Sequence, residues 1–324
     1  MKRLLALAIL ALLLCGCSGG TELDVSDRAP APEDRLVVFS CLEESVGEPL
    51  VKEFQERTGI WVQVQTGSAR ELMDRIAAGE PCDLLLGCGA DFLEANGDWF
   101  LPCRVEAAYS QWVPEGSCWT PLSLRPLVIV YNTKLVRQNL PTGWDSLLSD
   151  AWMGEIAFAD PDASEFSRTV LWALTQQYPD RTAEETLGAL AANLETLLDS
   201  TEAVVSRVAD GEYCLAAVPE DAALRRMRSG AELAIVYPEE GTYLVPDCGA
   251  IPVSCAHPEN ARAFLEFVVG ADAQNHAWDT WDRGPVLEEL AQLPANSRFY
   301  DAAEAGSAQA GLLEAWEPIW GEAS

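Results

Sequence analysis

Apolar positions in residues 35–101 switch between two periods, which predicts strands alternating with helices. Short apolar runs of strand length lie at 35–40, 60–66 and 82–87. Between them, apolar side chains recur at helical spacing in residues 47–59 and 68–76. Ser68 and Glu71 have the spacing of a capping box, which marks the start of the second helix. The order predicts a parallel sheet with helices on its faces.

The pattern resumes in a second unit after residue 126. Strands are expected at 127–132, 154–160, 212–218, 232–238 and 248–254. Helices are expected at 164–178, 201–211, 220–230 and 257–270. We therefore predict an α/β protein of two lobes, each a mainly parallel sheet flanked by helices, hinged by two crossings of the chain. Lobe 1 takes residues 35–125 and returns, with C-terminal helices, in 251–324, whereas lobe 2 takes 126–250.

The first residues resemble an export signal. Lys2 and Arg3 precede an apolar run too short to span a bilayer comfortably. The run ends in Leu-Cys-Gly-Cys, which resembles a bacterial lipoprotein signal over residues 1–17, with Cys17 as the lipidated residue. Residues 18–34 are rich in Gly, Pro and Ser and read as a flexible tether. We therefore expect the protein at the outer face of the cytoplasmic membrane, where the lipid alone holds it. The alternative is that the segment is an ordinary cleaved signal or a short anchor.

Charge excludes one class of partner. The chain has 21 Lys and Arg against 51 Asp and Glu, a net charge of −30. Nucleic acid requires cationic side chains to neutralise phosphates, so we expect no nucleic-acid partner. The same charge argues against a peripheral contact with anionic lipid.

Eight cysteines remain after Cys17, and an even number in an exported chain favours disulfides. Cys103 and Cys118 bracket one polar loop and are a plausible pair. Cys82 and Cys88 would lie about 20 Å apart along one strand, too far to bridge. Many thiols would stay free in a chain from an anaerobe. Cys41 and Cys88 both follow lobe 1 strands and could form a disulfide, pack as small residues or bind a soft metal.

Several segments in this order resemble the solute-binding proteins of bacterial ABC importers, in the ferric-iron-type family of the type II periplasmic-binding fold. They are "VVFSCLEESVGEPLVKEFQERTGIWVQVQTGSARELMDRI", "DLLLGCGADFLE", "SLRPLVIVYNTKLV", "GEIAFADPDASEFS", "VADGEYCLAAVPEDAAL", "AIVYPEEGT" and "HPENARAFLEFV". The resemblance implies two lobes that close over a small-molecule ligand. It also implies delivery to ABC permease and ATPase subunits, action as a monomer and no cofactor.

In such a fold the ligand lies at loops after the strand ends, where helix N-termini point. The candidate ligand-binding residues of lobe 1 are Ser40, Cys41, Thr66, Gly67, Ser68, Gly87, Cys88 and Gly89. Ser123 and Arg125 stand where the chain first crosses between lobes. The candidates of lobe 2 are Asp162, Ser164, Glu220, Asp221 and Thr242.

The candidate residues favour a small anion or zwitterion, such as a phosphonate, phosphate ester or carboxylate. Gly67 and Ser68 would offer backbone N–H groups, and Arg125 a guanidinium fork. Alternatively, Arg125 pairs with a buried acid such as Asp160, and Ser68 only caps its helix. Glu220 and Asp221 could bind an ammonium group or cap a helix.

Ferric iron is the alternative ligand. The resemblance implies two adjacent tyrosines after a lobe 2 strand, but the chain has Pro219, Glu220 and Asp221 there. Tyr237 and Tyr243 are separated by a turn and do not replace the pair. The two histidines form no cluster, and His257 before Pro258 is typical of a helix start.

An enzyme is not expected. The chain has no Gly-x-Ser-x-Gly, no His-Glu-x-x-His and no phosphate loop with lysine. A surface sensor that presents the ligand to a partner shares every feature of the transport receptor and stays a second alternative.

Overall fold

The computed structural model describes residues 34–105, 113–275, 282–287, 290 and 293–323. The predicted lipoprotein signal with Cys17, and all but the last residue of the predicted tether, lie outside these residues. None of the described helices has both the length and the hydrophobicity that a membrane crossing requires.

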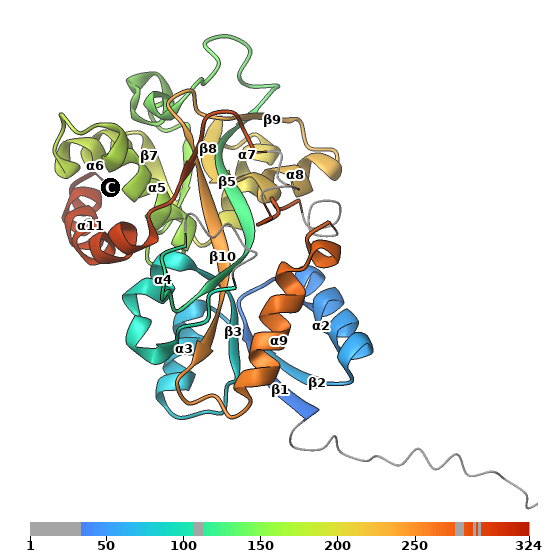
Figure 1. The fold of residues 1–324 in the computed structure, drawn as a ribbon. Coiled ribbons are helices and arrows are strands. Elements are labelled where there is room, and N and C mark those ends of the chain that lie inside the picture. Colours follow the sequence, from blue (N-terminus) through green and yellow to red (C-terminus); the bar gives the residue numbers. More distant parts are fainter. Residues whose placement is uncertain (1–33, 106–112, 276–281, 288–289, 291–292, 324) are drawn as a thin grey trace, which may run out of the picture.

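The chain forms two lobes joined by long strands (Figure 1). Lobe 1 has a parallel sheet in which β1 lies between β2 and β3. Its elements are β1 (Arg35–Ser40), α2 (Glu44–Thr58), β2 (Trp61–Thr66), α3 (Ala69–Ala77), β3 (Leu84–Gly89), α4 (Ala90–Ala95), β4 (Phe100–Leu101) and α9 (Pro258–Val269). The predicted β-α-β-α-β order at the start of this lobe is confirmed.

Lobe 2 repeats the pattern, with β6 paired in parallel to β7 and β8. Its elements are β6 (Ile156–Ala159), α5 (Glu165–Gln177), α6 (Ala183–Ala191), β7 (Leu194–Leu198), α7 (Thr201–Asp210), β8 (Leu215–Pro219), α8 (Glu220–Arg228) and β9 (Leu233–Val236). Strand β7 was not predicted, because its half-exposed residues lack a continuous apolar run.

Two strands are shared by both lobes: β5 (Thr120–Asn132) and β10 (Thr242–Pro252). They run antiparallel to each other from the Thr120–Gly249 pair to the Pro126–Leu244 pair. β10 continues into lobe 1 beside β3, whereas β5 continues into lobe 2 beside β8 and β9. The sheet is therefore mixed rather than mainly parallel along these hinge strands. β10 already pairs with β3 at Asp247, a few residues before the predicted boundary at 250.

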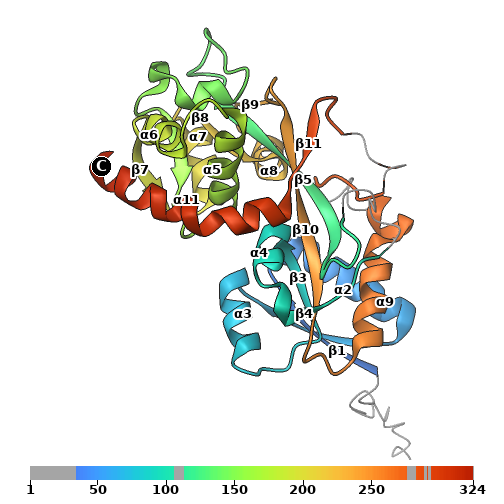
Figure 2. The ribbon, with the colours of Figure 1, turned by 60° about the vertical axis from the view of Figure 1, so that its left-hand side comes forward.

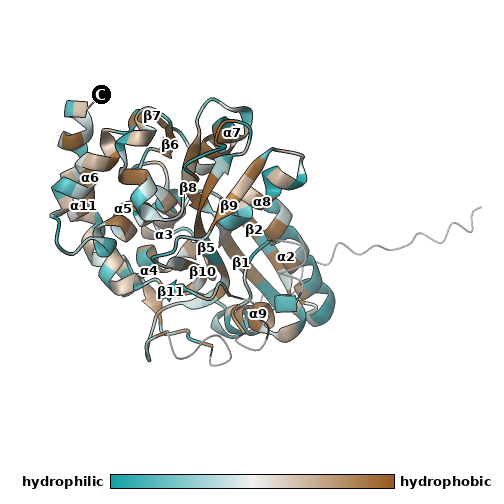
Figure 3. Cartoon of the chain, turned by 90° about the horizontal axis from the view of Figure 1, so that it is seen from above, coloured by the Kyte–Doolittle hydropathy of each residue, from teal (hydrophilic) through white to brown (hydrophobic). Residues whose placement is uncertain are grey.

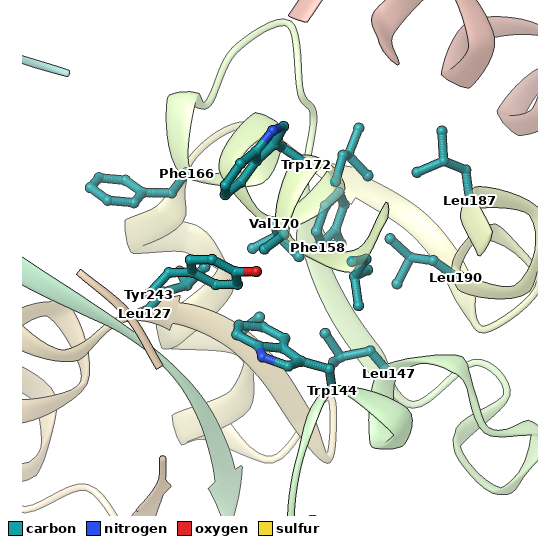
Figure 4. Packing of buried hydrophobic residues seen from close by; sticks show 14 of the residues in the cluster. Leu127, Trp144, Leu147, Phe158, Phe166, Val170, Trp172, Leu187, Leu190 and Tyr243 are labelled. Carbon is teal, nitrogen blue, oxygen red and sulfur yellow. The ribbon is translucent and has the colours of Figure 1, made fainter. Parts of the chain in front are cut away.

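The core of lobe 2 is rich in aromatic side chains (Figure 4). The ring of Trp172 meets the edge of Tyr243 at 5.3 Å and of Tyr300 at 4.8 Å between centroids. Viewed from above, apolar residues concentrate on interior strands, and hydrophilic residues face outward on the helices (Figure 3). At roughly 25 cal/mol per Å² of buried apolar surface, these cores supply the main drive for folding each lobe.

The C-terminal helix α11 (Ala302–Ala323) runs along lobe 2 on the side that faces α4 of lobe 1 (Figure 2). It packs on α4 of lobe 1 and on α5 and α6 of lobe 2. Trp316 is buried in the lobe 2 core, and Gly306 lies so close to Asp91 that an added Cβ would stand 2.6 Å from its carbonyl oxygen. The short strand β11 (Ser297–Phe299) precedes the helix and pairs with β10. The helix is thus a further link between lobes, not a part of lobe 1 alone.

All eight cysteines between Cys41 and Cys255 are free thiols in the structure. The predicted Cys103–Cys118 disulfide is therefore not formed. Instead, the Cys103 thiol donates to the Cys118 carbonyl oxygen at 3.1 Å. Burial raises the pKa of both thiols to about 11, so both groups are neutral at physiological pH.

Candidate functional site

A cavity of about 390 Å³ lies between the two lobes. Lobe 1 contributes the loop after β1, the start of α3 and a residue of α4, whereas lobe 2 contributes the start of α5. The lining residues are Cys41, Gly67, Ser68, Ala69, Arg70 and Phe92 from lobe 1, Asp162, Ala163, Glu165 and Arg168 from lobe 2, and Gln309 and Leu313 from α11. The structure thus brings together the predicted Cys41, Gly67, Ser68 and Asp162.

Two helices begin at this cavity. The hydroxyl of Ser68 accepts a hydrogen bond from the Glu71 N–H at 3.3 Å, and so caps α3. Ser164 caps α5 in the same way through the Ser167 N–H, also at 3.3 Å. The capping role given above as the alternative for Ser68 is therefore observed. First-turn N–H groups without a helical partner, together with the helix dipoles, favour an anion at this point.

Two arginines that the sequence analysis missed also line the cavity. Arg70 is exposed and has no hydrogen-bond or ion-pair partner within the part of the chain that the structure describes. Arg168 donates from Nη1 to the Pro161 carbonyl oxygen at 2.6 Å, and its buried Nε has no partner among the described residues. Each lies in the first turn of a helix that follows a strand. This position, in a chain with few cations, was the signal that could have identified them.

Glu165, in the first turn of α5, is an acidic group that lines the cavity. Burial, then the charges of Asp91 and Asp247, raise its pKa to about 7, although Arg125 and Arg168 oppose the shift. Near neutral pH its carboxyl group is therefore protonated for much of the time and can donate a hydrogen bond. An acid that can become neutral reduces the repulsion that an anion would meet.

Arg125 is held by acids of the protein. Its Nε and Nη2 donate to the two carboxylate oxygens of Asp221, both at 2.9 Å. Its Nη1 lies 3.7 Å from Asp247, and its guanidinium stacks 4.2 Å from the centre of the Phe166 ring. The alternative in which Arg125 pairs with a buried acid describes this arrangement, but the acid is Asp221 rather than Asp160.

Asp221 and Asp247 are shared by further arginines. Burial opposes ionisation of Asp221, yet Arg125 and Arg283 lower its pKa to about 2. Arg225 also contacts Asp221 at 2.7 Å. Asp247 accepts from the Ser123 hydroxyl at 3.0 Å and from Arg283. The network neutralises Asp221, so this acid is not available for an ammonium group of a ligand.

Residues 44–277 match the model of the bacterial extracellular solute-binding proteins. The chain belongs to this family. As such a protein, it is a transport component that binds a small ligand and delivers it to an ABC permease, and it is not an enzyme. The predicted family resemblance and two-lobed α/β fold are confirmed.

Relatives of this solute-binding protein differ in the ligands that their names give. The Fe(3+)-binding periplasmic protein of Serratia marcescens is 22% identical over 263 residues, covering 76% of this chain and 77% of its own. The periplasmic binding protein AfuA of Actinobacillus pleuropneumoniae, with fructose 6-phosphate bound, has a TM-score of 0.77 at 19% identity, covering 89% of this chain and 98% of that one. Apo ferric ion-binding protein A of Pasteurella haemolytica has a TM-score of 0.78 at 19% identity, covering 88% and 98%. At these identities, the structural likeness shows the fold alone.

The remaining predicted residues of this solute-binding protein lie outside the cavity. Ser40 and Thr66 line a separate hollow of about 490 Å³ on lobe 1. Cys88 and Gly89 are buried at the end of β3, together with Gly87. Glu220 accepts a hydrogen bond from the Tyr237 hydroxyl and lines a third pocket. Thr242 is fully buried at the start of β10.

Metal ligands do not converge in the described residues. No group of three or more His, Cys, Asp or Glu side chains there has an arrangement that could hold a metal ion. Tyr237 is bonded to Glu220, and Tyr243 is buried in the lobe 2 core. His257 precedes α9 as expected, and its ring nitrogen contacts Asp83 at 3.0 Å, at the opposite end of β3 from Cys88.

Proposed function

We propose that this solute-binding protein captures a small organic anion, such as a phosphate ester, phosphonate or carboxylate, in the cavity between α3 and α5. One observation carries the proposal: the N-termini of two helices, from opposite lobes, meet at one cavity together with Arg70 and Arg168. Each lobe supplies one helix N-terminus and one arginine. An anion would therefore contact both lobes and favour their closed arrangement.

The magnitudes are sufficient for binding by a strongly acidic protein. A helix N-terminus contributes roughly 0.3–1 kcal/mol to binding of an anion, and up to about 2 kcal/mol when partly buried. A charge-assisted hydrogen bond from an arginine contributes about 1.5–3 kcal/mol more. These groups attract the anion at short range. The repulsion between the anion and the net charge of −30 acts at long range, where salt screens it.

Ferric iron is the competing ligand, because two of the compared proteins carry iron in their names. The side chains support it less well. The position expected for paired tyrosines holds Glu220 and Asp221, and three arginines surround Asp221. A carboxylate so neutralised is a poor ligand for a cation of high charge.

Calorimetry on the purified protein separates the two ligands. The probes are fructose 6-phosphate, 2-aminoethylphosphonate, citrate and ferric citrate, each at fixed ionic strength. We expect at least one metal-free anion to bind, and Arg70→Gln and Arg168→Gln each to weaken it roughly ten- to hundredfold. Arg137→Gln is the matched control, because Arg137 bonds only to the Lys134 carbonyl oxygen at 3.2 Å among the described residues. Binding of ferric citrate alone, equal in all variants, would overturn the proposal.

We also propose that the protein is attached to the membrane by lipid at Cys17. The support is the order of Lys2 and Arg3, a short apolar run and Leu-Cys-Gly-Cys in the sequence. The folded lobes would then stand off the membrane on the polar residues 18–34. This position suits a receptor that must reach both free ligand and the permease.

A further inference from the structure

Two thiols meet beside the ligand cavity. Cys41 follows β1 and lines the cavity, where it is half-buried. Cys88 lies in β3 and is fully buried behind it. Their sulfur atoms are 2.9 Å apart, and both residues are free cysteines. The anion proposal above rests on two helix N-termini and two arginines and uses neither thiol.

The backbone of β3 is shaped so that Cys88 points toward Cys41. In a regular strand, Cys88 would share a face with Leu84 and Leu86. It instead belongs to the other hydrophobic cluster, which Leu85 forms and against which Cys41 packs. Gly87 produces the change, because its φ of +81° and a register shift opposite it form a bulge between β3 and β10.

This position of Gly87 admits no other residue without displacement. A Cβ atom there would lie 2.5 Å from the side chain of Leu42, and a φ of +81° strains any residue with a side chain. Leu42 is the residue after Cys41. The same bulge that turns Cys88 toward Cys41 therefore also leaves space for the loop that carries Cys41.

The two thiols are inequivalent. Hydrogen bonding to Cys41, then burial, raises the pKa of the Cys88 thiol well above its ordinary value. Cys88 consequently keeps its proton, whereas either sulfur can be the donor in the contact between the two thiols. Cys41 is the one of the two that lines the cavity, and an accessible sulfur is the one suited to nucleophilic attack.

We propose that Cys41 and Cys88 are a redox-active dithiol that forms a disulfide by exchange with a small disulfide entering the ligand cavity. Cys41 loses its proton to water and attacks one sulfur of the reagent RSSR, so that RS⁻ leaves and a mixed disulfide forms. Cys88 then loses its proton and attacks the Cys41 sulfur, and the second RS⁻ leaves. Two protein thiols are oxidised while RSSR is reduced to two RSH.

A third thiol could pair with Cys88 in place of Cys41. Cys248 of β10 stands opposite Cys88 in the strand register and is also fully buried. Its thiol is directed to the Pro246 carbonyl oxygen at 3.7 Å, and it does not line the cavity. Because exchange must begin at an accessible sulfur, Cys41 reacts first and Cys248 is bypassed.

The reaction changes the ligand cavity. Forming the bond ties the loop after β1 to the end of β3 and removes a free thiol from the cavity lining. An exported protein meets an oxidising environment, in which such a pair persists as a disulfide. The reduced and oxidised forms would thus present different cavity linings to a ligand.

Mass spectrometry of the folded full chain tests the proposal. Reduced protein is incubated with oxidised glutathione under native conditions, its remaining thiols are blocked with N-ethylmaleimide, and the non-reduced peptides are mapped. We expect the peptides that carry Cys41 and Cys88 to be joined, with a higher melting temperature for the oxidised protein. Cys41→Ser should abolish both the joined peptides and the glutathione adduct in the cavity.

Two further variants fix the order of the steps. Cys88→Ala should stop the reaction at a glutathione adduct on Cys41, and Cys248→Ala should behave as the unaltered protein. Cys103→Ala is the control for a buried thiol far from Cys41 in sequence and not lining the cavity. A Cys88–Cys248 link, or a stable Cys41 adduct in the unaltered protein, would overturn the proposal. The proposal would also be overturned if both Cys41 and Cys88 still reacted with maleimide when the protein was unfolded after its incubation with oxidised glutathione.

Discussion

The guanidinium of Arg125 and the carboxylate of Asp221 form two parallel hydrogen bonds of 2.9 Å between the hinge strand β5 and the start of α8. Both side chains are almost fully buried. Because β5 runs through both lobes, this pair fixes the start of α8 against the hinge. Arg225 extends the network across the lobes, since it also contacts Glu43 of lobe 1 at 3.1 Å.

Loss of the Asp221 charge should destabilise the protein. Asp221→Asn removes the carboxylate that accepts both 2.9 Å hydrogen bonds of the buried Arg125, and breaking one member of a buried ion pair costs about 3–5 kcal/mol. Chemical denaturation at pH 7 should show this loss. Asp199→Asn, at an exposed site, should leave the free energy of unfolding nearly unchanged. Equal stability of both variants would show that the network contributes nothing to folding.

The carboxyl group of Glu165 should make stability depend on pH. Its pKa is about 7 in the folded protein, against 4.5 for an ordinary glutamate. Its contribution is therefore complete below about pH 4.5 and is lost as the pH rises through 7, because the unfolded chain ionises first. Between pH 5 and pH 7.5 the melting temperature of the unaltered protein should fall relative to that of Glu165→Gln.

The control for that comparison is Glu184→Gln, because Glu184 is also in the first turn of a helix but is exposed. The difference in melting temperature between Glu184→Gln and the unaltered protein should not change with pH over the same range. If the difference in melting temperature between Glu165→Gln and the unaltered protein is also constant, Glu165 is ionised in the folded protein over this whole pH range.

Trp316 should be essential for the attachment of α11. It is buried in the lobe 2 core, 5.9 Å from the centre of the Phe158 ring. Trp316→Ala removes a large buried side chain, and such changes cost about 3–5 kcal/mol. Urea denaturation should show the loss, whereas Trp61→Ala, at a site 46% exposed, should cost much less. Similar costs would indicate that α11 is only loosely held.

Lipidation is tested by Cys17→Ser. We expect the variant to stay unprocessed or to be released from the membrane, because the acceptor thiol is absent. Cell fractionation with metabolic labelling by a fatty acid provides the measurement, and Cys15→Ser is the matched control. If the Cys17→Ser protein is still labelled and anchored, residues 1–17 are another kind of signal.

Local sequence patterns predicted the elements and their order. The capping box predicted at Ser68 acts within a single turn, and Ser68 caps its helix in the structure. The strands β1 and β3 were predicted from short apolar runs of strand length. The family resemblance also rested on such segments in sequence order, and the comparison with known families confirmed it.

The charges at the cleft could not be assigned in the same way. Arg125 was a plausible ligand contact by its place in the sequence, but its partner Asp221 is 96 residues away. The helix starts at Ser68 and Ser164 were placed at the ligand, but Arg70 and Arg168 were overlooked because local sequence does not show which first-turn side chains reach the cavity. Likewise, the bulge at Gly87 depends on the register between β3 and β10.

The sequence by itself determined which segments become strands and helices, because hydrophobic periodicity and capping act over a few residues. It also determined the family, through the order of those segments. Only the tertiary structure decided which charges are neutralised and which remain open. That outcome depends on distances between residues far apart in the chain, and Coulomb interactions and burial are set by those distances. Asp221 is thus held by arginines, whereas Arg70 is left exposed at the cavity.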